Sequence, residues 1–150
     1  AREGHRVSLV DQRKSRLEAA TRALPESEVS TDPASLWKCD AIAEVTGHSG
    51  VLEALLGGVG VGRTVLLLGF PYGKLDLNPE RLVAQDLSLL GSVGSGPADF
   101  QAALEILPSL SLDEFLKSTF PLEAYEEAWT THERGKALKV MLDVSGESEI

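Results

Sequence analysis

One stretch near the N-terminus decides the fold: Arg6-Val7-Ser8-Leu9-Val10-Asp11-Gln12-Arg13-Lys14-Ser15-Arg16. Its aliphatic and β-branched residues predict a strand over residues 5–10. Asp11 follows that strand, and a helix is expected over residues 12–24, which Pro25 ends. Strand, acid and helix in this order are typical of one repeating unit of an alternating α/β fold.

The rest of the chain continues the alternation. Further strands are expected at residues 28–30, 41–45, 64–68, 75–77, 87–93 and 137–143. Helices or helical turns are expected from Asp32-Pro33 and at residues 50–56, 79–84, 97–107, 112–116 and 122–131. Because residues 64–68 are apolar on both faces, they predict a strand covered by helices on both sides. The pattern predicts a parallel sheet built with right-handed crossovers.

Composition narrows the function. The 150 residues have 43% hydrophobic content, enough for the core of one ordinary domain. A net charge of −9 argues against a general binder of nucleic-acid backbones. No apolar run approaches the ~20 residues of a membrane span. A single cysteine, Cys39, excludes an internal disulfide, and no signal-peptide pattern is present, so we expect a cytoplasmic protein.

Polar and glycine residues follow several of the predicted strands. They are Asp11, Thr46-Gly47, Gly69-Phe70 and Ser92-Val93-Gly94. Ligands of parallel α/β sheets bind beyond the carboxyl ends of the strands. We therefore expect these four segments to form one rim at a binding site.

Asp11 is the most informative residue of this rim. A carboxylate can accept hydrogen bonds from two vicinal ribose hydroxyls and would repel a 2′-phosphate, which favours NAD over NADP. Arg13 leaves NADP open, and a plain helix cap is the alternative role for Asp11. In a dinucleotide-binding fold a glycine-rich phosphate loop lies roughly 20 residues before this acid, and the sequence has only ten residues there.

Other candidate motifs are weaker. Residues 58–62 (GVGVG) lie after a helix and before a strand, the reverse of a phosphate loop, and predict a helix stop and turn. Residues 91–96 (GSVGSG) lie between a predicted strand and a predicted helix, as a phosphate loop does. Their glycines do not have the spacing of the dinucleotide-binding fingerprint. His48 follows the Thr46-Gly47 segment and could contact a ligand, but a structural role is favoured. No histidine has metal-type spacing with another or with Cys39. No acid–base pair or hydrolytic triad is evident, so no catalytic residue is assigned.

With these segments in place, the sequence resembles the medium-chain dehydrogenase/reductase family, the zinc alcohol dehydrogenases and their relatives. The resemblance covers nearly the whole chain. It rests on residues 7–11 (VSLVD) with 16–20 (RLEAA), 39–47 (CDAIAEVTG), 62–70 (GRTVLLLGF), 89–92 (LLGS), 120–123 (FPLE) with Ala128, and 135–142 (GKALKVML).

The resemblance implies an oxidoreductase that moves a hydride between a nicotinamide cofactor and an alcohol or carbonyl substrate. It implies that Asp11 and Arg16 hold the adenosine ribose and that Lys139 lies near the pyrophosphate. It also implies that Val45, Thr46 and Gly47 line the cofactor groove. The nicotinamide carboxamide would meet the backbone around Leu68, Gly69, Phe70 and Ser92.

The sequence departs from this family at its N-terminal side. The catalytic domain, the first strand and the glycine loop are absent, and any zinc of the complete enzyme has no ligands here. We expect residues 1–94 to form an incomplete Rossmann domain and residues 95–150 to return partly to the catalytic domain. Since the first strand is central in the order 3-2-1-4-5-6, its loss predicts a two-strand and a three-strand piece.

Such a chain is expected to be inactive alone and to be completed by the remaining N-terminal part, in the same or another polypeptide. The complete enzyme is expected to be a homo-oligomer. Two alternatives stay open at this point: a nucleotide binder resembling an S-adenosylmethionine-dependent methyltransferase, and a non-catalytic remnant that acts as an assembly module.

Overall fold

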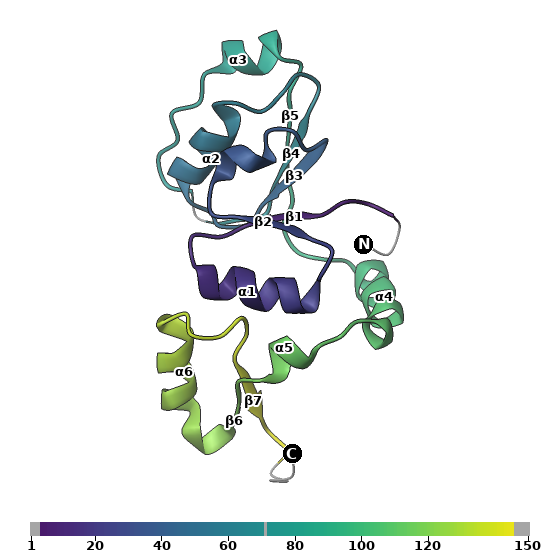
Figure 1. Cartoon of the computed structure of the whole chain (residues 1–150), viewed down its shortest axis with the longest axis vertical. Helices are drawn as coiled ribbons and strands as arrows, with labels where there is room; N and C mark the ends of the chain where they lie inside the picture. Colours follow the sequence, from purple (N-terminus) through teal and green to yellow (C-terminus); the bar gives the residue numbers. More distant parts are fainter. Residues whose placement is uncertain (1–3, 71, 146–150) are drawn as a thin grey trace. The chain divides into compact units, whose positions relative to one another are not determined.

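The computed structural model describes residues 4–70 and 72–145 (Figure 1). The chain divides into two compact units. Unit 1 comprises Ala1–Val29 and Ile106–Ile150, and unit 2 comprises Ser30–Glu105.

Unit 2 is built on three parallel strands in the order β3 (Ala41–Glu44), β4 (Thr64–Leu67) and β5 (Ser88–Gly91). The crossovers run through helix α2 (Ser49–Leu56) and helix α3 (Pro79–Ala84). A 3₁₀ turn, η1 (Pro33–Leu36), precedes β3. All three strands therefore end at the same edge of the sheet, which is where parallel sheets place their ligands.

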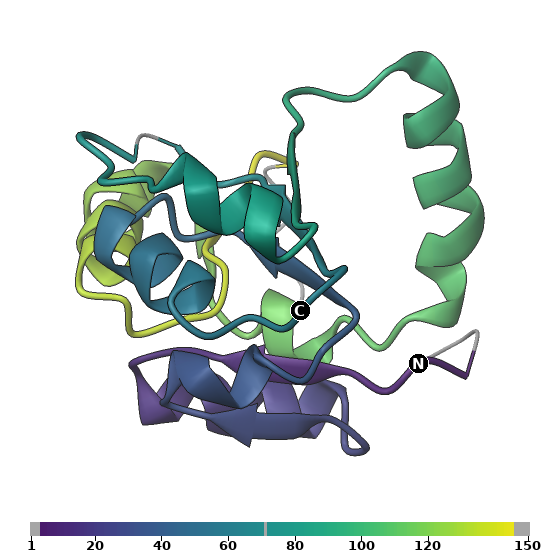
Figure 2. The ribbon, with the colours of Figure 1, turned by 90° about the horizontal axis from the view of Figure 1, so that it is seen from above.

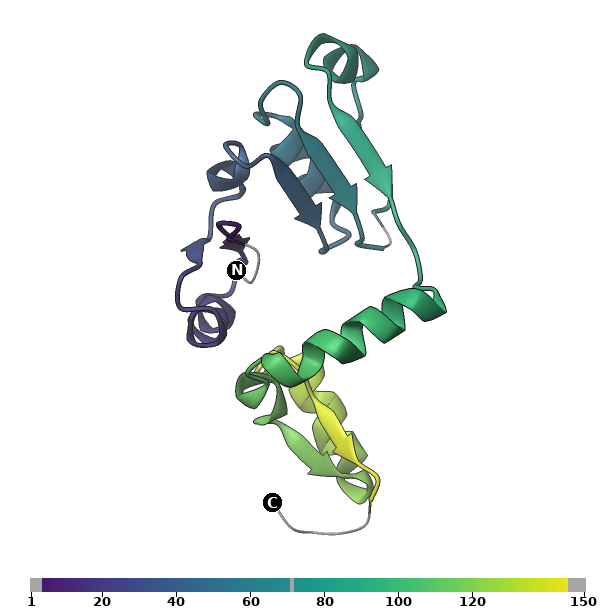
Figure 3. The same ribbon diagram turned by 90° about the vertical axis from the view of Figure 1, so that its right-hand side faces the viewer.

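The core of unit 2 lies between this sheet and α2, which Figure 3 shows behind the strands. The opposite face of the sheet is more open, since Ala43 is exposed and Leu90 is 52% exposed. Helices were expected on both faces of β4. Among the described residues of this unit, the face toward α2 is well covered and the opposite face is more exposed. The buried core consists of Ile42, Leu52, Leu55, Leu56, Val59 and Val65.

Unit 1 begins with β1 (Ser8–Val10), helix α1 (Lys14–Ala23) and β2 (Glu28–Ser30). The two strands pair and α1 lies beside them (Figure 2). Its second part contains α5 (Asp113–Leu116), β6 (Thr119–Pro121), the 3₁₀ turn η3 (Leu122–Ala124), α6 (Tyr125–Glu133) and β7 (Met141–Asp143). Strands β6 and β7 pair in parallel.

Helix α4 (Pro97–Ile106) and the 3₁₀ turn η2 (Leu107–Ser109) lie where the chain passes from unit 2 back into unit 1. Neither of them contains a buried residue. None of the helices in the described part of the chain is long and apolar enough to cross a membrane.

The partial Rossmann-type sheet expected from the sequence is confirmed. The relevant strands occur as a β1–β2 pair and as a separate β3–β4–β5 group. No strand joins the two groups within residues 4–70 and 72–145. In a parallel sheet the backbone groups of successive residues point to alternate sides. The Asp40 carbonyl accepts from Thr64 of β4, and the Glu44 carbonyl accepts from Leu68 directly after β4. Ala41 and Ala43 therefore direct their amides and carbonyls to the outer edge of β3.

Several expected boundaries were wrong. The prediction of a strand at residues 75–77 fails because the Asp76 amide donates to Glu53 Oε1 at 3.2 Å, while Leu75 and Leu77 pack on the core. Strand β6 was not predicted, since it has three residues and ends in proline. The strand expected from residue 137 begins only at Met141. The segment 58–62 is a turn between α2 and β4, as expected.

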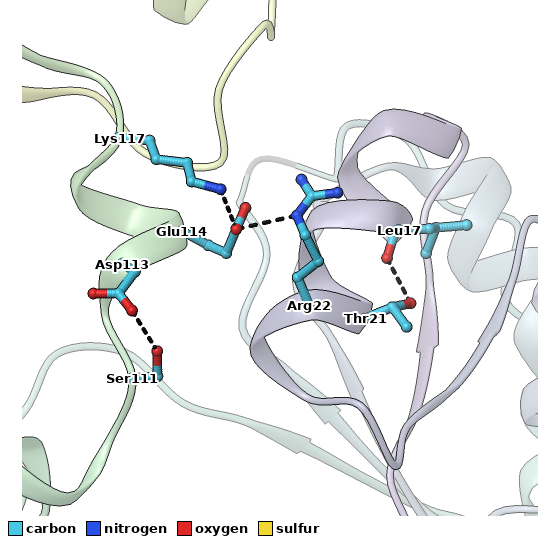
Figure 4. A network of polar contacts seen from close by, with 7 residues as sticks. All are labelled: Leu17, Thr21, Arg22, Ser111, Asp113, Glu114 and Lys117. Atoms are coloured by element: carbon cyan, nitrogen blue, oxygen red, sulfur yellow. Dashed lines mark hydrogen bonds and ion pairs between the residues drawn. The ribbon is translucent and has the colours of Figure 1, made fainter.

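A network of charged side chains joins α1 to α5 within unit 1 (Figure 4). Arg22 Nε donates to Glu114 Oε1 at 3.1 Å, and Lys117 Nζ contacts the same carboxylate from one turn further along. The hydrogen bond from Arg22, and then that from Lys117, hold the pKa of Glu114 below its usual 4.5. Glu114 is therefore more stable as a carboxylate in the folded protein than in the unfolded chain.

We expect Glu114→Gln to lower the Tm of the native protein by no more than about 3 °C at pH 7, because both cations that pair with Glu114 are more than half exposed and such ion pairs contribute little. A lowered folded-state pKa stabilises above the unfolded pKa and is lost as pH falls through the folded value. The difference from wild type should therefore shrink as pH falls below 4.5 and vanish once the pH lies below the folded-state pKa of Glu114. Calorimetry as a function of pH checks this, with Asp113→Asn as the control. Parallel Tm–pH curves for wild type and Glu114→Gln would contradict the assignment.

Candidate functional site

Two loops meet at the carboxyl edge of the sheet in unit 2: residues 46–48 after β3 and residues 68–70 after β4, here called the edge loops. A Cβ atom on Gly47 would lie 2.6 Å from the Phe70 amide nitrogen, and one on Gly69 would lie 2.0 Å from the Gly47 nitrogen. Gly47 also has a φ of +68°, which side chains with a Cβ rarely adopt. Only glycine at both positions lets the backbones approach this closely.

Glu44, the last residue of β3, lies beneath the edge loops and was not identified from the sequence. Its side chain is 2% exposed. Its Oε1 accepts from the Thr46 amide at 2.8 Å and from Thr46 Oγ1 at 2.5 Å, and its Oε2 accepts from the Gly47 amide at 3.2 Å. The only available signal was an acid ending an apolar strand, and that pattern does not distinguish a buried acid from a solvated one.

Burial would raise the pKa of Glu44, but the donors around it outweigh burial and the pKa is lowered. By geometry these donors are the Thr46 hydroxyl and the amides of Thr46 and Gly47, and the neighbouring Tyr72 phenol also lowers the pKa. The Tyr72 hydroxyl is buried and makes no hydrogen bond of standard geometry among the described residues. Burial and the Glu44 charge raise the pKa of Tyr72 to about 12. The site therefore holds a carboxylate beside a neutral phenol at physiological pH.

The first edge loop leads directly into α2. The His48 amide donates to Thr46 Oγ1 at 3.1 Å, and His48 Nδ1 accepts from the Gly50 amide at 3.2 Å. His48 is thus the N-cap of α2. This agrees with the structural role favoured for His48, because the ring is held by a hydrogen bond at the start of α2.

The structure brings together the seven residues of unit 2 that the sequence singled out. The Ser92 amide donates to the Leu67 carbonyl at 3.2 Å, which places the end of β5 beside the second edge loop. The outer surface of the loops is accessible, since Phe70 is 91% exposed and Val45, directly before the first edge loop, is 65% exposed. The seven residues are Val45, Thr46, Gly47, Leu68, Gly69, Phe70 and Ser92.

Asp11 lies in unit 1, directly after β1. Its Oδ1 accepts from the Arg13 amide at 2.8 Å, and its Oδ2 lies 3.7 Å from Arg16 Nη1. Asp11 is not the N-cap residue of α1, which was the alternative role. Arg13 occupies that position, and its side chain makes no capping hydrogen bond. Asp11 holds the turn before the helix, and its remaining lone pairs can accept further hydrogen bonds.

A pocket of about 200 Å³ opens beside Asp11. Complete small-molecule sites usually have roughly 300–1,000 Å³, so this pocket suits one end of a larger ligand. Lys139 follows the lining residue Leu138 and is exposed. The lining consists of Leu9, Val10, Asp11, Arg16, Leu17, Ala20 and Leu138.

Within the described residues, no three histidine, cysteine, aspartate or glutamate side chains gather as metal ligands. The geometry offers hydrogen-bond acceptors and close backbone approach at one place, and an acid beside a small pocket at another. These groups can bind and orient a ligand.

No protein-family model matches this sequence. A D-arabitol-phosphate dehydrogenase from Enterococcus avium is 26% identical over 80 residues, which are 52% of this chain and 23% of that protein. The chain thus spans about a quarter of the curated relative it matches.

Solved structures extend the likeness to most of the chain. A thermostable alcohol dehydrogenase from Pyrobaculum aerophilum matches with a TM-score of 0.74 and 20% identity, covering 93% of this chain and 43% of that one. An Escherichia coli protein described as a short chain alcohol dehydrogenase, complexed with NADH, matches with a TM-score of 0.71 and 16% identity, covering 85% of this chain and 41% of that one. The expected resemblance to the medium-chain alcohol dehydrogenases is therefore confirmed at the level of the fold, and this chain has the Rossmann-type α/β fold of part of such an enzyme.

Proposed function

We propose that this chain carries part of the nicotinamide-cofactor site of a dehydrogenase that acts on an alcohol or its carbonyl product. The observation that carries the proposal is the place of Asp11, at the carboxyl end of β1 and on the wall of a pocket too small for a whole cofactor. The shared fold with an alcohol dehydrogenase that holds NADH supports it.

In this proposal each unit binds one end of the cofactor. Asp11 accepts hydrogen bonds from the adenosine ribose, Arg16 orients Asp11, and Lys139 lies toward the pyrophosphate. In unit 2, Val45, Thr46 and Gly47 line the groove, and the backbone of Leu68, Gly69, Phe70 and Ser92 holds the carboxamide. The cofactor itself supplies the hydride, and this chain's residues bind and orient it.

NAD is the cofactor we propose, since the Asp11 carboxylate would repel a 2′-phosphate. Catalytic groups are assigned to the remainder of the enzyme. Zinc, if the enzyme uses it, would also be held there, because the described residues bring no ligand set together. The relative's name makes a polyol phosphate one substrate class to test first.

The remainder of the enzyme is proposed to complete the sheet, in the same or another polypeptide. A strand between the β1–β2 pair and β3 would satisfy the amides and carbonyls of Ala41 and Ala43, which otherwise lie at an open edge. We further propose residues 1–94 as the incomplete cofactor domain, residues 95–150 as a return to the catalytic domain, a homo-oligomeric enzyme and a cytoplasmic location.

The methyltransferase-like alternative also explains an acid such as Asp11 directly after β1. The comparisons favour the dehydrogenase, because the similar proteins are alcohol and polyol dehydrogenases. A non-catalytic assembly module would keep the fold without turnover, and the following experiment separates it from an enzyme.

We expect the intact protein, meaning this chain with the polypeptide that completes it, to reduce NAD⁺ in the presence of alcohols or polyol phosphates. Asp11→Asn should raise KM for NAD⁺ about 10- to 100-fold, because a hydrogen bond to a charged group contributes roughly 1.5–3 kcal/mol. KM for NADP⁺ should change less. Initial rates of NADH formation measure both.

Asp32→Asn is the matched control. Asp32 follows β2 as Asp11 follows β1, but its carboxylate caps η1 by accepting from the Ala34 amide at 2.9 Å. Asparagine caps about as well, so the kinetics should be unchanged. Equal KM values for wild type and Asp11→Asn would contradict the role of Asp11, and absence of turnover with retained assembly would favour the non-catalytic module.

A further inference from the structure

Glu44 connects both edge loops through different atoms. Its carboxylate accepts from the Thr46 and Gly47 amides of the first loop. Its backbone carbonyl accepts from the Leu68 amide at 2.9 Å and the Gly69 amide at 3.1 Å of the second loop. Among the described residues, Glu44 is the one charged residue that is buried. One residue thus fixes the orientation of four peptide groups at the site.

The direction of these amides determines the direction of the adjoining carbonyls. In a planar trans peptide the N–H and the preceding C=O point in opposite directions. The Thr46 and Gly47 amides point toward the carboxylate, so the carbonyls of Val45 and Thr46 point away from it. By the same geometry the carbonyl of Leu68 points away from the Glu44 carbonyl. The loops therefore turn acceptors outward.

A carboxylate suits this task better than its neutral analogues. Three donors converge on its two oxygens, and glutamine would replace one acceptor by an NH₂ group facing an amide. An apolar residue would leave buried donors unpaired, at about 1–3 kcal/mol each. The side chain also fits a tight space, since a Cβ on Gly69 would lie 2.9 Å from Glu44 Oε2. The Glu44 carboxylate and the glycines Gly47 and Gly69 therefore pack against one another.

We propose that Glu44 is a positioning residue for the nicotinamide end of the cofactor, because it turns the backbone carbonyls of the edge loops toward the hydrogen-bond donors of the carboxamide and the adjacent ribose. Glu44 does not touch the cofactor in this account and acts through the loops. The inference rests on the proposed function, because it needs a nicotinamide cofactor at this edge.

The experiment compares two ligands, NADH and ADP-ribose, by calorimetric titration of the intact protein. ADP-ribose lacks nicotinamide but keeps the adenosine end and the pyrophosphate. We expect Glu44→Gln to raise Kd for NADH about 10-fold and to leave Kd for ADP-ribose unchanged. The kcat at saturating NADH should change less than the kcat/KM. General damage to the fold would weaken both ligands equally.

Two further variants complete the design. Thr46→Val removes the hydroxyl that donates to Glu44 and also accepts from the His48 amide, and it should raise the ratio of the two Kd values about threefold. If Glu44→Gln does not fold, Thr46→Val tests whether Glu44 positions the edge loops for the nicotinamide end. Asp40→Asn is the control for charge, because Asp40 pairs with Arg63 at the other end of β3. Its two Kd values should match wild type.

The outcomes separate the two proposals. An NADH-specific loss in Glu44→Gln, or in Thr46→Val if the first variant does not fold, supports the role of Glu44. Unchanged affinity for NADH, or an equal loss for NADH and ADP-ribose, overturns it. If the wild-type protein binds neither ligand, the proposed function itself fails.

Discussion

Replacing Gly69 with alanine should destabilise unit 2 by at least about 3 kcal/mol and abolish measurable NADH binding. The added Cβ would lie 2.0 Å from the Gly47 nitrogen and 2.5 Å from the Gly47 Cα. Both atoms belong to the backbone, so no side-chain rotation can relieve the contact. The edge loops would have to separate, which breaks the hydrogen bonds that Glu44 makes to them.

Chemical denaturation and NADH titration of the intact protein measure these two effects. Gly91→Ala is the matched control, because Gly91 ends β5 near the same edge and an added Cβ meets nothing within 4 Å there. It should keep wild-type stability to within about 1 kcal/mol. A Gly69→Ala protein as stable as Gly91→Ala would show that the loops do not pack as described.

Much of the fold was predictable because local chemistry determines it. The start of α3 follows from Asn78-Pro79, since Asn78 Oδ1 accepts from the Glu80 amide at 3.0 Å. The start of η1 follows from Asp32-Pro33 in the same way. Apolar strands between such caps can be read directly from the sequence. The two groups of strands were also predictable, because the order of strands in a Rossmann sheet places the absent strand at the centre.

The candidate site was less predictable because its geometry depends on distant residues. The role of Glu44 requires Gly69 and Tyr72, which lie more than twenty residues further along the chain. Nothing in residues 41–45 indicates that these partners bury the carboxylate. Strand β6 was missed for a related reason, since only its pairing with β7 makes three residues a strand.

The 150-residue chain by itself is expected neither to bind NADH nor to transfer hydride, and this is the largest effect we predict. The proposed cofactor contacts are divided between two units, and the backbone groups of Ala41 and Ala43 point to the outer edge of β3, where no further strand pairs among the described residues. Each unmatched group costs free energy if it is buried, and an open edge also favours aggregation. Completion by the missing strand should therefore restore both stability and binding.

Co-expression of the chain with the polypeptide that carries the missing strand checks this prediction. Native mass spectrometry should show the two associated, or one longer polypeptide if they are continuous in the native protein. The completed protein should unfold at a clearly higher temperature than the chain alone. A monomer of 16.0 kDa that binds NADH without a partner would contradict the prediction.

The central claim is that this chain holds part of a nicotinamide-cofactor site, and titration of the intact protein with NADH and with S-adenosylmethionine tests it most directly. We predict saturable binding of NADH at one site per chain, weakened at least about 10-fold by Asp11→Asn, and no binding of S-adenosylmethionine. Saturable binding of S-adenosylmethionine with none of NADH would contradict the claim.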